Sequence, residues 1–222
     1  MPETIAIFGG TGQTGTHAVA YALEKGYKVQ ILVRNASKVT TKNENLTVIE
    51  GDITDKAALE KNIKGATYVV SFVGGPNNPS EYPKGMMLNF AKLLWPLLEA
   101  ESSVKVFLYQ AGGLAAVPGK PLSFVTKIIR FIAAWAMGIG PMIADNEQTA
   151  AWMHENKKDS FAVIVTLPGA LKESDSGEVV EVTNDAPLPF GPITFKALAI
   201  ATVNAVTKES LYGTFPYVVP TK

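Results

Sequence analysis

The stretch that decides the fold is Ile5-Ala6-Ile7-Phe8-Gly9-Gly10-Thr11-Gly12-Gln13-Thr14-Gly15. An apolar run, which predicts a β-strand, passes directly into glycines spaced G-x-x-G-x-x-G, and a helical stretch follows. In such a loop Gly9 permits the tight turn, Gly12 lets the backbone approach a pyrophosphate, and Gly15 lets the helix pack closely on the strand. The first N–H groups of the helix then face the anion. This context favours a diphosphate-binding site over a chance glycine-rich loop.

The second predicted strand carries a further signal at its end. Lys28–Val33 is an apolar run that ends on Arg34, and Lys38 follows shortly after. In dinucleotide-binding folds the tip of this strand meets the adenosine ribose, where an acid binds a free 2′-hydroxyl and an arginine accommodates a 2′-phosphate. Arg34 therefore favours NADP(H) over NAD(H), with Lys38 adding positive charge. The alternative is a solvated charge at a strand end.

Composition limits the possible classes of protein. The chain has 222 residues, of which 47% are hydrophobic and 18% charged, as expected for one globular domain with a sizeable core. The formal net charge of 0 gives no reason to expect a nucleic-acid partner. The chain has no cysteine and only two histidines, His17 and His154, so we expect neither disulfides nor a bound metal.

Strand-like and helix-like segments alternate along the chain. Short runs rich in valine and isoleucine predict strands buried on both faces. The predicted strands are Thr4–Phe8, Lys28–Val33, Leu46–Ile49, Thr67–Phe72, Val104–Tyr109 and Phe161–Leu167. The predicted helices are Gly12–Lys25, Lys56–Ile63, Pro83–Ala100, Ile143–Asn156 and Thr194–Val206.

This alternation predicts an α/β fold with a Rossmann-like, doubly wound parallel sheet in a three-layer αβα arrangement. We expect a single NAD(P)-binding domain over residues 1–222, because no repeat or linker divides the chain. Residues 171–222 would form a small region on the substrate side. Within it, Glu178–Val182 and Leu211–Val219 could add short strands or a flap.

Ligands of such sheets bind at the carboxyl ends of the strands. Glycine recurs just after four predicted strands, at Gly51, Gly74, Gly112 and Gly169. Small residues at these tips leave room for a ligand. The alternative is local, because glycine and proline often end strands. This alternative explains a glycine at any one strand tip, but it explains less well why glycine recurs at four of them.

Together these residues resemble the atypical short-chain dehydrogenase/reductase group, whose members carry an NAD(P)H-binding domain. The group includes biliverdin/flavin reductase-like, isoflavone reductase-like and NmrA-like proteins. The matching pieces are the glycine loop Gly9–Gly15, Val33-Arg34 with Lys38, Gly51-Asp52-Ile53, and Leu167-Pro168-Gly169 with Leu171. The short length is most similar to the flavin reductase-like branch.

The resemblance implies a role for each matching position. The backbone from Thr11 through Gln13 to Thr14 would cradle the pyrophosphate, and Arg34 would face the 2′-phosphate. Asp52 and Ile53 would line the adenine, Val73 and Gly74 would pass beneath the adenosine ribose, and Pro168 and Gly169 would lie beside the nicotinamide. The expected cofactor site therefore comprises Gly9, Thr11, Gly12, Gln13, Thr14, Gly15, Arg34, Lys38, Asp52, Ile53, Val73, Gly74, Pro168 and Gly169.

The chain departs from the wider superfamily at its catalytic positions. Its one Tyr-x-x-x-Lys, Tyr21 to Lys25, falls in the first predicted helix, away from the expected cofactor. Where atypical members often show paired serines, this chain has Tyr109-Gln110. Gln110 could donate a hydrogen bond to a developing oxyanion, or it could stabilise a turn.

Asp145 is the second catalytic candidate, with Asn146 beside it. Both lie near the start of the next long predicted helix. The alternative for Asp145 is an acid that stabilises the helix dipole. Tyr82 could reach the mouth of the site, or it could be a packing aromatic.

Residues 121–144 form an apolar insert whose only charges are Lys127 and Arg130. The uncharged part is too short to span a bilayer. We expect it to wall an apolar substrate pocket. The alternatives are a self-association surface, a helix lying on a membrane, or an ordinary buried helix.

These observations predict an NADPH-dependent oxidoreductase that transfers hydride to a small, apolar, planar acceptor such as a flavin, quinone, enone or other carbonyl. The alternatives are an NADP(H)-binding regulatory or scaffold protein without turnover, and a non-redox isomerase or cyclase. We expect a monomer or homodimer. Because no basic-then-apolar leader precedes the first predicted strand, we also expect a cytoplasmic protein.

Overall fold

The centre of the sheet is β1 (Thr4–Phe8), which pairs in parallel with β2 (Lys28–Val33) on one side and β4 (Tyr68–Ser71) on the other. The computed structural model describes residues 2–76, 78–174, 178–185 and 191–221. The strand order is β3-β2-β1-β4-β5-β6-β10-β8, and only β8 runs antiparallel to its neighbour. The other strands of this sheet are β3 (Leu46–Glu50), β5 (Val106–Gln110), β6 (Ala162–Pro168), β8 (Val180–Thr183) and β10 (Tyr217–Pro220).

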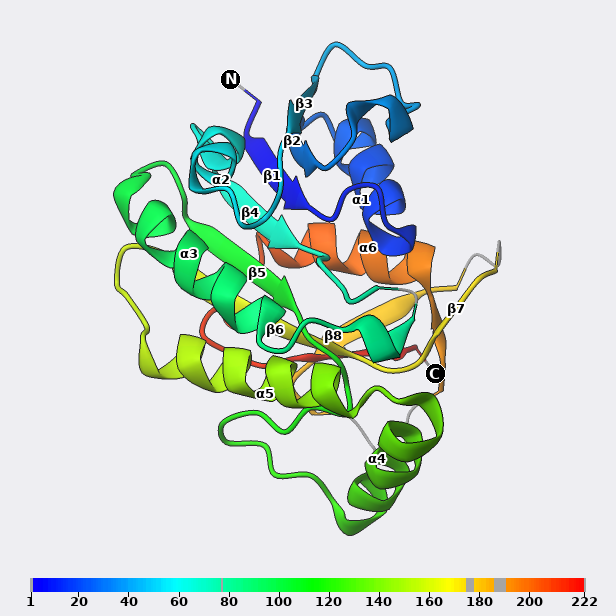
Figure 1. The fold of residues 1–222 in the computed structure, drawn as a ribbon. Coiled ribbons are helices and arrows are strands. Elements are labelled where there is room, and N and C mark those ends of the chain that lie inside the picture. The colour runs from blue at the N-terminus through cyan, green and yellow to red at the C-terminus, as the bar shows by residue number, and fades with distance from the viewer. Residues whose placement is uncertain (1, 77, 175–177, 186–190, 222) are drawn as a thin grey trace.

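Helices cover both faces of the sheet, which confirms the predicted Rossmann-like α/β fold with three layers (Figure 1). On one face, α1 (Gln13–Glu24) packs beside α6 (Phe195–Ala205). The opposite face is covered by α2 (Lys56–Ile63), α3 (Met86–Ala100) and α5 (Gly140–Glu155). A further helix, α4 (Phe124–Met137), projects beyond the sheet next to the start of α5.

Alternate residues of the strands build two cores. Phe8 and Tyr109 belong to the core under α2, α3 and α5, whereas Ile7 and Leu108 belong to the core under α1 and α6. This follows from the two-residue period of a strand, which sends successive side chains to opposite faces. All four residues are fully buried, as the continuous apolar runs predict.

Short elements complete the chain. Residues Leu171–Lys172 and Ile193–Thr194 form a separate two-stranded parallel sheet, β7 with β9. Among the described residues, 3₁₀ helices cover Ala36–Lys38, Pro79–Glu81 and Glu209–Leu211.

Several predicted boundaries differ from the observed ones by two residues or more. Helix α5, for example, begins at Gly140 and not at Ile143, and two other differences have a clear cause in the backbone. The helix predicted from Pro83 begins at Met86, because Gly85 takes a left-handed φ of 72° at the N-cap. The strand predicted over Leu211–Val219 is limited to β10, because a 3₁₀ helix and the left-handed Gly213 (φ 73°) come first. Helix α4 was predicted only as an apolar insert.

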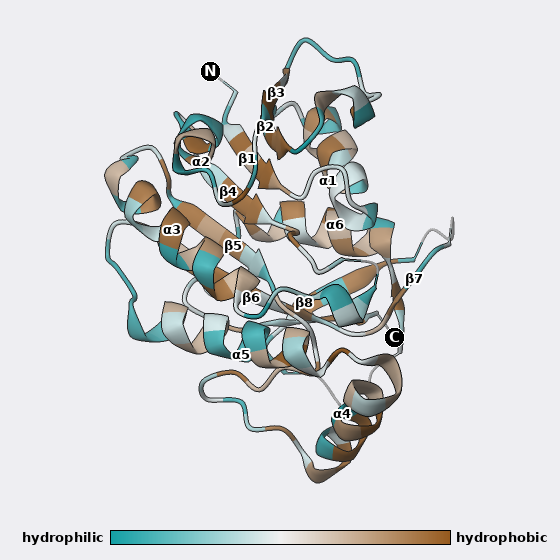
Figure 2. Cartoon of the chain, viewed as in Figure 1, coloured by the Kyte–Doolittle hydropathy of each residue, from teal (hydrophilic) through white to brown (hydrophobic). Residues whose placement is uncertain are grey.

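Apolar residues are concentrated in the strands and on α4 (Figure 2). In the part of the chain that the structure describes, no helix has the length and apolar character needed to cross a bilayer. The apolar character of α4 therefore needs another explanation.

Candidate functional site

The glycine loop lies at the carboxyl end of β1, where contacts with neighbouring backbone exclude side chains. Gly9 has a φ of 77°, and a Cβ atom there would lie 2.8 Å from the backbone carbonyl of Phe72. A Cβ atom on Gly15 would lie 2.0 Å from the carbonyl oxygen of Gly9. The first contact brings the loop against the segment after β4, and the second seats α1 on the loop. Both glycines are therefore required by the fold itself.

The start of α1 remains open to a ligand. Gly12 is the N-cap residue, and no side chain caps the helix. Thr11, Gly12 and Gln13 are exposed, whereas Thr14 is buried. The N–H groups of an uncapped first turn are donors that attract anions. This cradle therefore fits the pyrophosphate of a dinucleotide.

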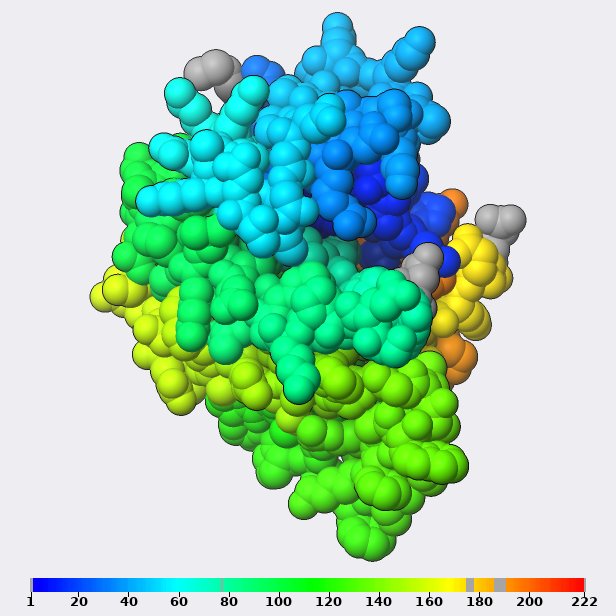
Figure 3. Space-filling view, viewed as in Figure 1, coloured from blue at the N-terminus to red at the C-terminus, as the bar shows by residue number. Residues whose placement is uncertain are grey.

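The loop also occupies the topological switch point of the sheet. From β1 the chain order proceeds outward to β2 and β3 on one side and to β4, β5 and β6 on the other. A crevice forms outside the strand ends at such a point. Gly9 approaches the backbone of Val73. Gly74 is exposed beyond it, and a Cβ atom there would have no neighbour within 4 Å. In Figure 3 the blue surface of the N-terminal segment adjoins the blue-green surface of the segment after β4.

The adenosine end of the predicted site gathers residues from the ends of β2 and β3. Arg34 directly follows β2 and is exposed, as is Lys38 in the following 3₁₀ helix. Asp52 accepts hydrogen bonds from the hydroxyl and the backbone N–H of Thr54, at 2.7 and 3.0 Å. These bonds, with a smaller contribution from the charge of Arg34, hold the pKa of the Asp52 carboxyl below its usual value. Ile53 packs against the core.

The nicotinamide end of the predicted site is formed by the ends of β5 and β6. Pro168 ends β6, and its carbonyl accepts a hydrogen bond of 2.7 Å from the N–H of Gly113, which links the two strand tips. Gly169 follows and is half-buried. Gln110 pairs in register with Thr166 of β6.

Two polar atoms at this edge lack partners. Gln110 Oε1 and Thr166 Oγ1 are buried and have no hydrogen-bond partner among the described residues. A buried polar atom without a partner costs free energy unless a ligand or a water satisfies it. Gln110 thus stays a candidate. Sequence analysis missed Thr166, because a threonine inside an apolar strand gives no sign of its partner across the sheet.

Asp145 has contacts that favour a structural role over the catalytic role that we predicted. It is only 3% exposed and accepts a hydrogen bond of 2.6 Å from the hydroxyl of Tyr82. It also accepts backbone N–H groups of Met87 and Leu88, at 2.8 and 3.2 Å. From α5, Asp145 therefore caps the N-terminus of α3, rather than stabilising the dipole of its own helix.

Two tyrosines, Tyr82 and Tyr109, are also buried, and the hydroxyl of each donates a hydrogen bond to a residue of α5. Tyr82 is buried, and burial together with the Asp145 carboxylate raises the pKa of its hydroxyl. The hydroxyl of Tyr109 donates a 2.6 Å hydrogen bond to Asn146 Oδ1, and burial raises the pKa of Tyr109 as well. Tyr82 is therefore a packing aromatic, and its hydroxyl is engaged in the α3–α5 contact.

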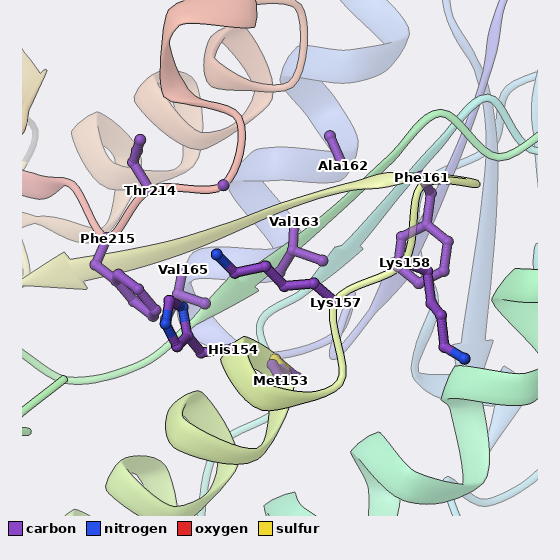
Figure 4. Close-up of a pocket in the computed structure, with 11 residues that line it drawn as sticks. Met153, His154, Lys157, Lys158, Phe161, Ala162, Val163, Val165, Thr214 and Phe215 are labelled. Atoms are coloured by element: carbon purple, nitrogen blue, oxygen red, sulfur yellow. The ribbon is translucent and has the colours of Figure 1, made fainter. Parts of the chain in front are cut away.

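A small cavity of about 100 Å³ lies elsewhere, between the end of α5 and the first part of β6 (Figure 4). His154 and Phe215 lie side by side in its lining, with ring centroids 5.8 Å apart. None of the predicted site residues lines this cavity. Its volume is also smaller than that of typical small-molecule sites, so we do not assign the cofactor to it. Among the described residues no group of three histidine, cysteine or acidic side chains could hold a metal ion.

Sequence comparison identifies a protein family that covers most of the chain, including the glycine loop. The model of a family described as NAD(P)H-binding matches residues 9–209, which is most of the chain. An isoflavone reductase homologue from Zea mays is 32% identical over 79 residues, which cover 32% of this chain and 26% of the relative. A second homologue from Nicotiana tabacum is 34% identical over 80 residues. The matched part thus spans about a quarter of the curated relatives.

Solved structures share the fold over nearly the whole chain. A protein from Lactobacillus casei superposes with a TM-score of 0.77 at 19% identity, covering 99% of this chain and 100% of that one. The oxidoreductase ylbE from Lactococcus lactis gives 0.74 at 16% identity, covering 99% and 91%. ChuY, an anaerobillin reductase from Escherichia coli, gives 0.68 at 14% identity, covering 97% and 96%. At these identities the likeness concerns the fold alone.

Proposed function

Because the chain belongs to the NAD(P)H-binding family, we propose that it is an NADPH-dependent reductase that transfers hydride to a small, apolar, planar acceptor. The acceptor class comprises flavins, quinones, enones and similar carbonyl compounds. The two curated relatives are named as homologues of isoflavone reductase, and this supports the reaction class.

The observation that carries the proposal is the exposed glycine cradle at the uncapped start of α1. It combines open N–H donors, the helix dipole and the sheet's switch point at one place. Gly12 would let the pyrophosphate approach the backbone, with Thr11, Gln13 and Thr14 around it. Val73 and Gly74 would support the adenosine ribose.

The preference for NADPH over NADH rests on charge at the end of β2. Arg34 and Lys38 are both exposed there. Asp52, which follows β3, is the acid near Arg34, but its carboxylate is engaged by Thr54. A guanidinium can bind a 2′-phosphate with charge-assisted hydrogen bonds, whereas NADH offers only a hydroxyl.

At the other end of the site, the chain's own residues would hold the acceptor beside the nicotinamide. When bound, the cofactor supplies the hydride. Pro168 and Gly169 would form the wall on which the nicotinamide lies. Gln110 and Thr166 offer the polar atoms that the fold leaves without partners, and the amide of Gln110 could orient a carbonyl oxygen of the acceptor.

One observation favours the second candidate, a binding protein without turnover. The hydroxyls of Tyr82 and Tyr109 are both engaged in buried hydrogen bonds, with Asp145 and Asn146. Neither tyrosine is therefore placed as a ready general acid. Reduction of a flavin or a quinone depends less on such an acid, because the cofactor supplies the hydride and the protein mainly positions the acceptor.

Calorimetric titration with NADPH and with NADH, followed by absorbance assays with flavin, quinone and enone acceptors, would test the proposal. We expect tighter binding of NADPH and oxidation of NADPH by at least one acceptor class. Tight binding without oxidation by any acceptor would favour the regulatory role. Absence of dinucleotide binding would overturn both.

A further inference from the structure

Helix α4 turns its apolar side toward solvent. Trp135, Phe124 and Phe131 are 81%, 77% and 74% exposed. The other exposed apolar residues of the helix are Val125, Ile128, Ile129, Ile132 and Met137. Single exposed apolar residues are common on proteins, but a contiguous group of this kind marks a contact surface. Met137 lies at the end of the helix, on another side, and we call the other seven residues the α4 face (Figure 2).

The opposite side of α4 is polar and faces the protein. Thr126 is the buried residue of the helix. Arg130 forms a two-pronged ion pair with Glu147 of α5, and Glu147 also accepts the backbone N–H of Ala116 at 2.6 Å. The Ser123 hydroxyl caps the helix by accepting from the N–H of Thr126.

This orientation reverses the usual pattern of a surface helix. A helix of a soluble protein normally turns its apolar stripe to the core and its charged side to water. In α4 the ion pair and the cap hold the polar side inward, so the apolar side is presented outward by specific bonds. The exposure of the α4 face is thus a feature of the fold.

The chain segment that carries the α4 face offers a free basic side chain and no exposed acid, since Arg130 is paired with Glu147. No acidic residue occurs between Glu101 and Asp145, and Asp145 itself is buried. Lys127 is exposed at the border of the face, one helical turn before Phe131. Such a surface complements an anionic partner. In a self-associated pair it would bring lysines together without an acid in the same segment to neutralise them.

We propose that the α4 face binds the surface of a bilayer containing anionic phospholipid. With no described helix able to cross a membrane, α4 would lie in the interface plane. Its aromatic and aliphatic side chains would enter the boundary between headgroups and acyl chains. Trp135 has the amphipathic ring that favours this depth, and Lys127 would meet the anionic headgroups. The proposal concerns binding and does not depend on catalytic activity.

Vesicle sedimentation tests this directly. The wild-type chain should pellet with vesicles of phosphatidylcholine and phosphatidylserine, and less with phosphatidylcholine alone. Replacing Phe124, Phe131 and Trp135 together by serine should lower the partition coefficient at least about tenfold, because the buried apolar area is lost. Lys127→Glu should lower it about fivefold or more, only on the anionic vesicles.

A matched control is Val179→Ser. Val179 is 66% exposed but lies outside α4, so its replacement should leave sedimentation unchanged. Phospholipids brominated in their acyl chains give a second readout. They should quench the fluorescence of Trp135, whereas Trp95, which is 4% exposed, is shielded in the core. This quenching should disappear in Trp135→Phe while sedimentation persists.

Two results would overturn the proposal. One is a wild-type chain that pellets with neither kind of vesicle. The other is a stable dimer that the triple serine substitution converts into a monomer, which would assign the α4 face to a second copy. Circular dichroism of each variant confirms that the substitutions leave the fold intact, as the exposure of all three aromatic residues leads us to expect.

Discussion

At the scale of single residues, Arg34 carries the preference for the phosphorylated dinucleotide. We expect Arg34→Ala to weaken NADPH binding about tenfold to a hundredfold while changing NADH binding little, because only NADPH has a 2′-phosphate for the guanidinium to contact. Calorimetric titration of both dinucleotides measures this. Lys42→Ala is the control, since Lys42 is an exposed cation in the nearby loop. Equal losses for the two dinucleotides would remove the 2′-phosphate role.

Gly12 and Gly15 should respond differently to substitution, although both belong to the same loop. A Cβ atom on Gly12 would lie 3.3 Å from the Gly9 carbonyl oxygen, a contact that a small shift relieves. Gly12→Val should therefore leave the protein folded but abolish dinucleotide binding, since the side chain blocks the approach to the backbone. Titration calorimetry on the folded variant tests this, and retained affinity would place the cofactor elsewhere.

Gly15→Ala should instead destabilise the fold. Its Cβ atom would lie 2.0 Å from the Gly9 carbonyl oxygen, so α1 and the loop must move apart. We expect the free energy of unfolding to fall by about 1–3 kcal/mol, as for an overpacked core. Gly112→Ala is the control, because a Cβ atom there has open space. Denaturant unfolding of both variants measures the difference, and equal stability would contradict the packing argument.

At the scale of elements, α3 and α5 are joined by Asp145. We expect Asp145→Ala to lower the free energy of unfolding by about 2–4 kcal/mol, because it removes the cap of α3 and leaves the buried Tyr82 hydroxyl without its acceptor. NADPH affinity of the folded variant should change little. Glu155→Gln, an exposed substitution on the same helix, is the control. Unchanged stability with lost turnover would restore the catalytic role.

At the scale of the whole molecule, cofactor binding should stabilise the folded state. At a free NADPH concentration about 100 times Kd, linkage contributes about 2.7 kcal/mol. For a domain of this size that raises Tm by about 5–10 °C. Thermal unfolding with and without NADPH measures the shift. Gly12→Val should show none, and a wild-type chain whose Tm ignores NADPH would argue against a cofactor site.

The sequence by itself determined the order of the main strands and helices, apart from α4 and the short strands β7 and β9, and the position of the glycine loop. Both follow from local rules: apolar runs of strand length, helical periodicity between them, and glycine where backbone must come close. The resemblance in Gly9–Gly15 also identified the family. Local patterns carry this information because the hydrogen bonds and most of the packing of a βαβ unit join residues that are close together in the sequence.

Only the tertiary structure decided which distant groups meet. Asp145 caps α3 by accepting from the N–H of Met87, which lies 58 residues earlier in the chain, so its sequence position suggested only a catalytic acid or an acid at the start of its own helix. Thr166 became relevant only when β6 paired with β5 and set it opposite Gln110. In the same way, the sequence favoured a pocket wall for the apolar insert and left open a self-association surface, a helix on a membrane and a buried helix. The Arg130–Glu147 pair orients α4 with its apolar side to solvent, which rules out the buried helix and does not fit a pocket wall. Such contacts depend on the packing of whole elements, which local sequence does not encode.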